Sequence, residues 1–176
     1  SKIVLLCQHI EGYRSLCRLI TRSYTEGQIQ GVPYIRHEWL QDATDGLIGL
    51  SCAREGDIGQ ALINGNQELA KTSLAEWLKL FPDRFYLELQ RTARAKEDMY
   101  IKDAVTLAAS FDVPVVATND VRFLDKEDFE AHEARVCIQQ SYTLNDPRRP
   151  LLYSPQQYLR DAEEMITLFE DIPEAI

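Results

Sequence analysis

The sequence of 176 residues lacks any long hydrophobic run and is poor in basic residues. No stretch approaches the roughly 18 apolar residues that a membrane-spanning helix needs, and no basic segment followed by an apolar one marks a secretory signal. There are 19 lysines and arginines against 28 aspartates and glutamates, which gives a formal net charge of −9. Proteins that bind nucleic acid neutralise phosphates with clustered basic side chains, so we expect this segment not to bind DNA or RNA by itself.

Cysteine is scarce, and its spacing suggests no pairing. The four cysteines, Cys7, Cys17, Cys52 and Cys137, form no CxxC motif. Cys7 lies in an apolar stretch and Cys17 on the apolar side of a helical pattern, so both are expected to be buried free thiols. Scattered free thiols are typical of the reducing cytoplasm, where disulfides are rare. We therefore predict a cytoplasmic protein without disulfides and without a membrane partner.

The sequence does contain 45 % hydrophobic residues, which is enough for one sizeable core. Short apolar stretches alternate with helical patterns along the chain. The expected strands are residues 2–7, 46–51, 84–90 and 113–118. The expected helices are residues 11–26, 57–63, 66–81 and 96–111, with further helices within 125–140 and from 161. Strands joined through helices favour right-handed crossovers, so we predict an α/β fold with a parallel sheet.

Polar residues follow three of the expected strands. Ser51 and Cys52 follow the second strand, residues 90–92 end the third, and residues 118–122 end the fourth. Ligands of parallel sheets bind at the carboxyl ends of the strands, so these three groups are expected to lie along one edge.

The last of these groups, around Asp120, is a candidate for a metal site. Asp120 suits a metal ligand, because hydrolytic metal sites gather Asp, His, Glu or Cys from several strand ends. A histidine two positions later would supply a second ligand, but the sequence has Arg122 there. Arginine is always protonated and has no lone pair to offer a metal. A strand end in which Arg122 forms a salt bridge with Asp120, or with a neighbouring carboxylate, is therefore favoured over a metal site.

The other candidate residues are weaker. His9, His37 and His132 lie on three different elements, and one histidine does not make a site. His9 ends the first expected strand and is a candidate for the same edge, whereas His132 is predicted to be a hydrogen-bonded structural residue. Glu88 alternates with leucines along its strand, so it points to the other face, where a buried carboxylate needs a partner such as an arginine. Ser51 has no matched base, which argues against a nucleophilic triad.

Several blocks of the sequence resemble one family in the same order. They are "EGYRSLCRLITRSY", "EGDIGQALINGNQELA", "RFYLELQRT", "VPVVATNDVRFLDKEDFEAHEARVCI" and "YSPQQYLRDAEEM". They are similar to the N-terminal polymerase-and-histidinol-phosphatase (PHP) domain of bacterial replicative DNA polymerase III alpha subunits, of the proteobacterial type. The likeness covers essentially the whole chain. It implies that residues 1–176 are part of a distorted (βα)7 TIM-like barrel, with the first barrel strands upstream and the palm, fingers and thumb downstream.

The resemblance also implies that metal ligands have been lost at the strand ends. Metal-binding members of the family carry histidine at the positions of Thr92 and Arg122, and some carry cysteine at the position of Ala53, beside Cys52. Asp120 alone keeps a ligand's identity. Because metal affinity depends on the number of converging ligands, the resemblance implies a relic site without catalytic, cofactor-binding or metal-binding residues.

Three functions are compared. The leading hypothesis is a non-catalytic PHP module of a DNA-directed DNA polymerase in chromosomal replication, which stabilises the polymerase and docks a separate proofreading exonuclease subunit. By the resemblance, DNA is contacted by the parent's other domains, and magnesium is needed only in its polymerase site. The alternative is an active metal-dependent phosphoesterase or 3′–5′ exonuclease, which would require histidine in place of Thr92 and Arg122. An unrelated α/β binding domain is the third.

Overall fold

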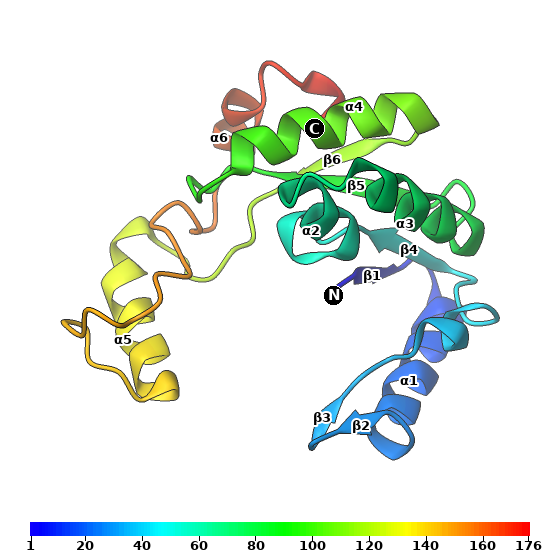
Figure 1. Cartoon of the computed structure of the whole chain (residues 1–176), viewed down its shortest axis with the longest axis horizontal. Coiled ribbons are helices and arrows are strands. Elements are labelled where there is room, and N and C mark those ends of the chain that lie inside the picture. The colour runs from blue at the N-terminus through cyan, green and yellow to red at the C-terminus, as the bar shows by residue number, and fades with distance from the viewer.

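The computed structural model describes residues 1–176 and contains a four-stranded sheet flanked by helices (Figure 1). The strands of the sheet, in spatial order, are β1 (Val4–Cys7), β4 (Leu47–Leu50), β5 (Phe85–Gln90) and β6 (Val115–Thr118). A separate hairpin consists of β2 (Gln28–Ile29) and β3 (Val32–Pro33). The α-helices are α1 (Ile10–Thr25), α2 (Asp57–Ile63), α3 (Gln67–Leu80), α4 (Glu97–Phe111), α5 (Phe129–Gln140) and α6 (Ala162–Leu168). Short 3₁₀ helices cover His37–Leu40, Ala53–Glu55, Lys126–Asp128 and Pro173–Ala175.

The expected parallel sheet is confirmed for β4, β5 and β6 but is wrong for β1. Val4 pairs with Leu50 and Cys7 with Leu47, so β1 runs antiparallel to β4. The reason is that α1 does not cross a face of the sheet. It projects away, and the chain returns through the hairpin to the end of the sheet that it left (Figure 1). There the Gln8 amide donates a 2.9 Å hydrogen bond to the Gly46 carbonyl, so β4 has to start beside the end of β1.

The projecting position of α1 also corrects the expectation for two cysteines. Cys7 and Cys17 are both exposed, not buried. The buried residues of α1 are Gly12, Leu19 and Ser23. Gly12 lies so close to the backbone of Gly46 that a Cβ at this position would be 2.0 Å from the Gly46 carbonyl oxygen. The helix therefore comes closest to the sheet at Gly12, next to the start of β4, and Cys17 lies on an exposed side.

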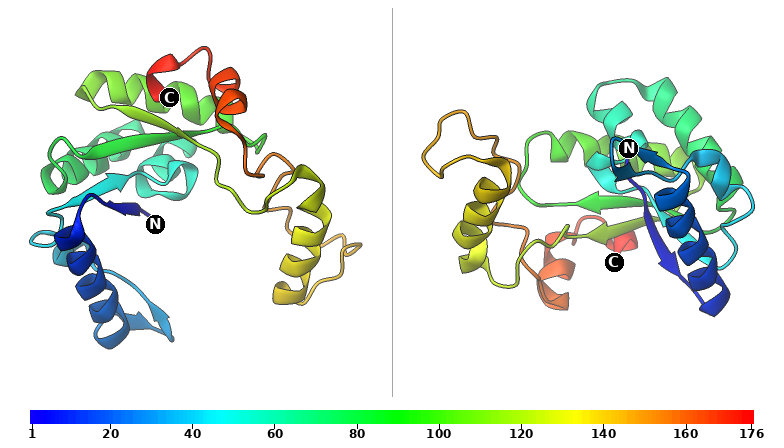
Figure 2. Two further views of the ribbon diagram at one scale, coloured as in Figure 1. Left: turned by 180° about the vertical axis from the view of Figure 1, so that it is seen from behind. Right: turned by 90° about the horizontal axis from the view of Figure 1, so that it is seen from below.

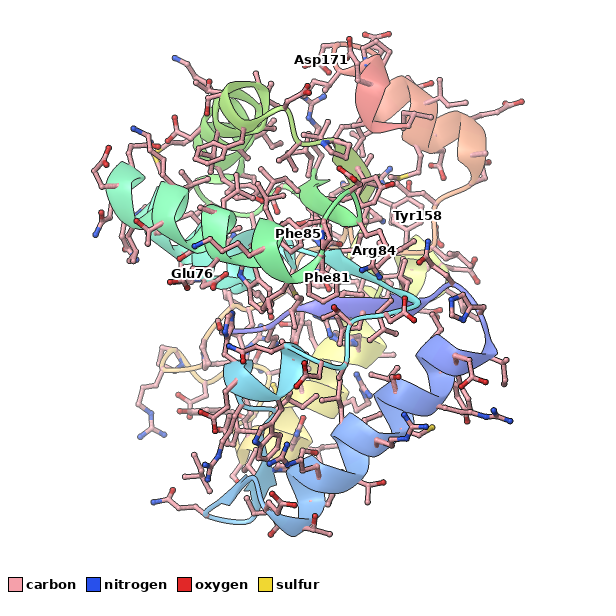
Figure 3. All side chains as sticks on the ribbon, turned by 90° about the vertical axis from the view of Figure 1, so that its right-hand side faces the viewer. Glu76, Phe81, Arg84, Phe85, Tyr158 and Asp171 are labelled. Carbon is pink, nitrogen blue, oxygen red and sulfur yellow. The ribbon has the colours of Figure 1, made fainter.

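The main core lies between the sheet and the helices α2, α3 and α4. Phe85 and the two leucines of β5 that alternate with Glu88 belong to a cluster of 23 buried apolar residues. The Phe85 ring is stacked on Trp77 of α3 at 5.9 Å, and Phe81 lies beside both. Figure 3 shows Phe81, Phe85 and Arg84 close together where α3 ends. The residues of β5 with even numbers are thereby directed to the opposite face.

The expected helix boundaries are largely confirmed, and the capping residues explain them. Gly65, with φ of +74°, separates α2 from α3, because a left-handed backbone conformation ends a helix. The Asp161 side chain accepts a 2.8 Å hydrogen bond from the Glu164 amide and forms a capping box at the start of α6. None of the helices has both the length and the apolar character needed to cross a membrane.

Residues 124–153, which contain α5, form an arm that stands apart from the sheet (Figure 2). The segments through which the chain enters and leaves the arm lie side by side. The Arg122 amide donates a 2.8 Å hydrogen bond to the Gln157 carbonyl, and Phe123 pairs with Tyr158 in an isolated parallel bridge. The arm and α1 project from the two ends of the sheet, which gives the molecule the outline of an arch (Figures 1 and 2).

Candidate functional site

The carboxyl ends of β4, β5 and β6 meet along one edge, as the sequence predicts. The Ser51 hydroxyl after β4 accepts a 2.9 Å hydrogen bond from the Glu88 amide in β5. The Gln90 side chain donates a 3.1 Å hydrogen bond to the Thr118 hydroxyl at the end of β6. These contacts fix the three strand ends relative to one another, and we call the group of polar residues around them the strand-end site.

Arg94 occupies the centre of the strand-end site. Its guanidinium donates to the Thr92 hydroxyl at 2.8 Å, to Glu97 at 3.2 Å and to Gln90 at 3.1 Å, and it pairs with Asp120 at 3.2 Å. The side chain is only 10 % exposed. Thus a single buried cation joins the end of β5, the start of α4 and the end of β6. Sequence reasoning misses this residue, because Arg91, Arg94 and Lys96 form a local basic cluster that is typical of a solvated surface.

Asp120 is held by two arginines. Besides Arg94, the Arg122 guanidinium lies 2.6 Å from the Asp120 carboxylate, which confirms the predicted salt bridge. The Gln157 amide donates a further 2.7 Å hydrogen bond to the same carboxylate. Asp120 itself adopts φ of +43°, a left-handed conformation that is uncommon for residues other than glycine, asparagine and aspartate. The turn therefore directs the carboxylate between two fixed cations.

The start of the chain lies at the same edge because β1 is antiparallel. Lys2 forms a salt bridge with Glu55, and this hydrogen bond lowers the pKa of Glu55. Lys2, Glu55 and Arg94 line one pocket of about 520 Å³, together with neighbours of the last two in the sequence and with residues 151–154. His9 ends β1 at the other end of the sheet, where it caps α1 through a hydrogen bond from the Gly12 amide. Its candidacy for the strand-end site is wrong for that reason.

The positions of the expected relic ligands are closely packed. Thr92 is fully buried, and both its amide and its hydroxyl donate to Glu97. Ala53 is 1 % exposed and belongs to a turn in which Cys52 has φ of +58°. Burial, with a further contribution from the charge of Glu88, raises the pKa of the Cys52 thiol to about 11. The thiol is therefore protonated at neutral pH and is a poor nucleophile or ligand.

Glu88 is the one acidic residue of the site that no arginine contacts. It is 4 % exposed and lies on the face of β5 opposite the leucines, as expected. One carboxylate oxygen accepts a 2.9 Å hydrogen bond from the Thr118 hydroxyl, and the other has no partner. Its partner is thus a hydroxyl group and not an arginine. Burial raises the pKa of this carboxyl.

Glu88→Gln is expected to stabilise the protein at neutral pH. The pKa of Glu88 is higher in the folded protein than its ordinary value of 4.5. The protonated carboxyl therefore contributes to stability below pH 4.5, and this contribution is lost as the pH rises through the pKa of the folded protein. The neutral amide avoids the loss, so its advantage over wild type should grow between pH 4.5 and pH 7.5 in urea denaturation. Glu163→Gln, at an exposed position of α6, is the control without such an advantage. Equal effects of Glu88→Gln at both pH values would contradict this assignment.

The histidines do not meet. His37 packs edge-on against Trp77 at 4.9 Å beside the main core, and His132 lies in the arm with Arg135 3.3 Å from its Nδ1. The prediction of a hydrogen-bonded structural His132 is confirmed. Across residues 1–176, no three His, Cys, Asp or Glu side chains gather in a way that would hold a metal ion.

Comparison with known proteins decides the family. The family model described as "PHP domain" matches residues 1–92, which is more than half of the 176 residues. The chain belongs to the PHP domain family. It is 51 % identical over 176 residues to DNA polymerase III subunit alpha of Pseudomonas aeruginosa, and 48 % identical over 176 residues to that of Vibrio cholerae. The corresponding protein of Escherichia coli K12 is 48 % identical over 174 residues. These alignments cover 99–100 % of this chain and 15 % of each relative, so the chain spans about 15 % of the length of the curated relatives it matches.

The strand-end site of this PHP domain does not fit a divalent metal ion. A metal would need converging neutral or anionic donors. Asp120 instead has a guanidinium group on each side, and the Thr92 hydroxyl is engaged with Glu97 and Arg94. Two positive charges at the carboxylate would repel an incoming cation, so we derive no metal-dependent step at this edge.

Proposed function

We propose that this PHP domain is a non-catalytic structural module of a bacterial DNA polymerase III alpha subunit, and that the whole protein is a DNA-directed DNA polymerase of chromosomal replication in the cytoplasm. The single observation that carries the non-catalytic role is the position of Arg94, which pairs with Asp120 and Glu97 at the centre of the strand-end site. Identity of about half over the whole chain to three alpha subunits supports the parent activity.

The module's proposed task is to stabilise the polymerase and to dock the proofreading exonuclease subunit of the replicase. The side chains of Arg94 and Arg122 support this role, because they hold three strand ends in place without taking part in a reaction. In this proposal DNA is bound by other domains of the polymerase, where magnesium serves nucleotide transfer. No metal or other cofactor acts in residues 1–176.

The test is a metal and nuclease analysis of the full polypeptide, purified without chelators. We expect less than one zinc, manganese or iron per chain, and no hydrolysis of a 3′-labelled single strand in manganese by a variant whose polymerase site is inactivated. The Arg94→Met variant serves as the comparison, since it removes the central cation. Two or three tightly held metals per chain, with hydrolysis that Asp120→Asn abolishes, would instead establish the alternative of an active metal-dependent phosphoesterase or exonuclease.

We also propose that further strands of the whole protein complete this sheet into the distorted (βα)7 barrel of the PHP fold. Both β1 and β6 are edge strands, and unpaired edges are rarely left open in native proteins. The outward side of α1 supports the same idea, with Tyr13, Ile20 and Tyr24 each 45–59 % exposed. Amide exchange of β1 and β6 in the full polypeptide tests it: slow exchange is expected at both edges, and fast exchange at both would contradict it.

A further inference from the structure

The arm has a small core of its own, built around His132. The imidazole is 6 % exposed and lies between two aromatic rings. Phe123, at the root of the arm, is 5.4 Å away between ring centres. Tyr153, where the chain leaves the arm, is 4.7 Å away and perpendicular to the imidazole. His132 therefore joins the entering and the leaving segments of the arm.

The hydrogen bond between Arg135 and His132 favours the neutral form of the imidazole. The Arg135 guanidinium lies 3.3 Å from Nδ1, and because a guanidinium can only donate, Nδ1 has to accept. The single hydrogen of the neutral ring is then on Nε2, which is buried without a polar partner and lies among aromatic rings. A second proton would go to Nδ1, which would turn an acceptor into a donor that faces another donor.

Two arginines near His132 oppose its protonation as well. Arg135 on α5 faces the ring directly, and Arg122 packs on Tyr153, 5.4 Å from the centre of that ring. The charge of Glu133 acts in the opposite direction and raises the pKa of His132, although Glu133 is paired with Arg149 through one of its carboxylate oxygens. Burial first, and Arg135 second, lower the pKa of His132 below its ordinary value.

The same residues connect the arm to the strand-end site. Arg122, which packs on Tyr153, also forms the 2.6 Å salt bridge with Asp120. Ser154, next to Tyr153, donates a hydrogen bond to the Thr92 carbonyl. A continuous set of contacts thus runs from the His132 ring through Tyr153 and Arg122 to Asp120.

We propose that His132 is a pH-sensitive lock, whose neutral imidazole holds the entering and leaving segments of the arm together and whose protonation loosens the arm. The proposal is independent of the proposed replicative role, because it rests only on contacts within residues 119–154 and on the contact of Ser154 with Thr92. Since the folded-state pKa is lowered, the stability contributed by neutral His132 is fully present above its ordinary value of 6.5. It is lost as the pH falls below that value towards the folded-state value, since the open arm binds the proton more tightly.

Hydrogen–deuterium exchange of the full polypeptide at several pH values between 7.5 and 5.5 tests the lock. After correction for the intrinsic exchange rate, the opening equilibrium of residues 124–153 should rise by up to about tenfold per pH unit within the titrating window. His132→Gln cannot be protonated, and its amide oxygen can accept from Arg135, so its arm should open equally at all these pH values. His37→Gln is the matched control and should keep the wild-type pH dependence.

A second variant keeps the proposal testable if His132→Gln opens the arm at every pH. Arg135→Met leaves the imidazole in place but removes the donor and the positive charge that disfavour the second proton. The folded-state pKa of His132 should then rise towards 6.5, and the total change in arm opening between pH 7.5 and pH 5.5 should shrink. The lock is refuted if wild type shows no pH dependence in residues 124–153, if His132→Gln retains it, or if Arg135→Met leaves it unchanged.

Discussion

Arg94→Met is expected to lower the free energy of unfolding by about 3–5 kcal/mol, the usual cost of removing one partner from a buried charge network. The substitution leaves Asp120 with Arg122 alone, and it leaves the buried Glu97 carboxylate with only the amide and hydroxyl hydrogen bonds of its neighbours. Methionine retains most of the side-chain volume, so the loss reflects charge and hydrogen bonding rather than a cavity. Urea denaturation near pH 7.5 measures it.

Two further variants identify the cause of the loss at Arg94. Arg94→Lys keeps the charge but not the planar fork that reaches four partners, so its stability should lie between those of wild type and Arg94→Met. Arg148→Met, at a side chain 82 % exposed, is the control that should leave the denaturation midpoint unchanged. A cost for Arg94→Met no larger than that of the control would refute the central role of this arginine.

Phe85→Ala is expected to cost about 3–5 kcal/mol, as truncation of a buried aromatic residue in a core usually does. Phe85 is 1 % exposed, is stacked on Trp77 and contacts Phe81, so no solvent is available to fill the space. This cost should be the same at acid and neutral pH, because the substitution removes no charge. Both losses are measured by the same urea denaturation series.

The control for Phe85→Ala is Ile138→Ala in the arm. Ile138 is 81 % exposed, and truncation of such a residue changes stability by about 0.5 kcal/mol or less. Phe85→Leu, which keeps an apolar side chain in the core, should cost less than the alanine variant. If Phe85→Ala and Ile138→Ala were equally stable, the packing of β5 against α3 would be wrong.

The apolar periodicity of the sequence, and the polar residues that follow the expected strands, predicted much of this architecture. The order of strands and helices from residue 46 to residue 118 could be predicted, because those segments pack on each other in sequence order. The direction of β1 could not, since an apolar stretch such as residues 2–7 reads the same in either direction. The apolar pattern of residues 11–26 indicated a helix correctly, but a pattern does not say which side meets the sheet. That depends on the close approach of Gly12 to Gly46, which is a tertiary contact.

The local contacts of the strand-end site could be predicted from the sequence, but its long-range contacts could not. Asp120 and Arg122 are two residues apart, so their salt bridge follows from local geometry. Arg94 lies in a loop after β5, and its direction is set by Thr92, Glu97 and a carboxylate 26 positions later in the chain. The signal available in the sequence was Glu97 three positions after Arg94, the spacing of a first helical turn. No local pattern indicates that such a pair turns inward.

The cation at the strand ends is covalently attached to the chain, and its occupancy therefore does not depend on supply. A bound metal ion stabilises its site by an amount that grows with the logarithm of the free metal concentration, and it is lost when a chelator competes. Arg94 is present at full stoichiometry as soon as the chain is synthesised. Its contribution to folding should be the same in cells starved of manganese or zinc as in cells that are replete. With this side chain in place, the edge lacks the open coordination positions on which metal-assisted hydrolysis depends.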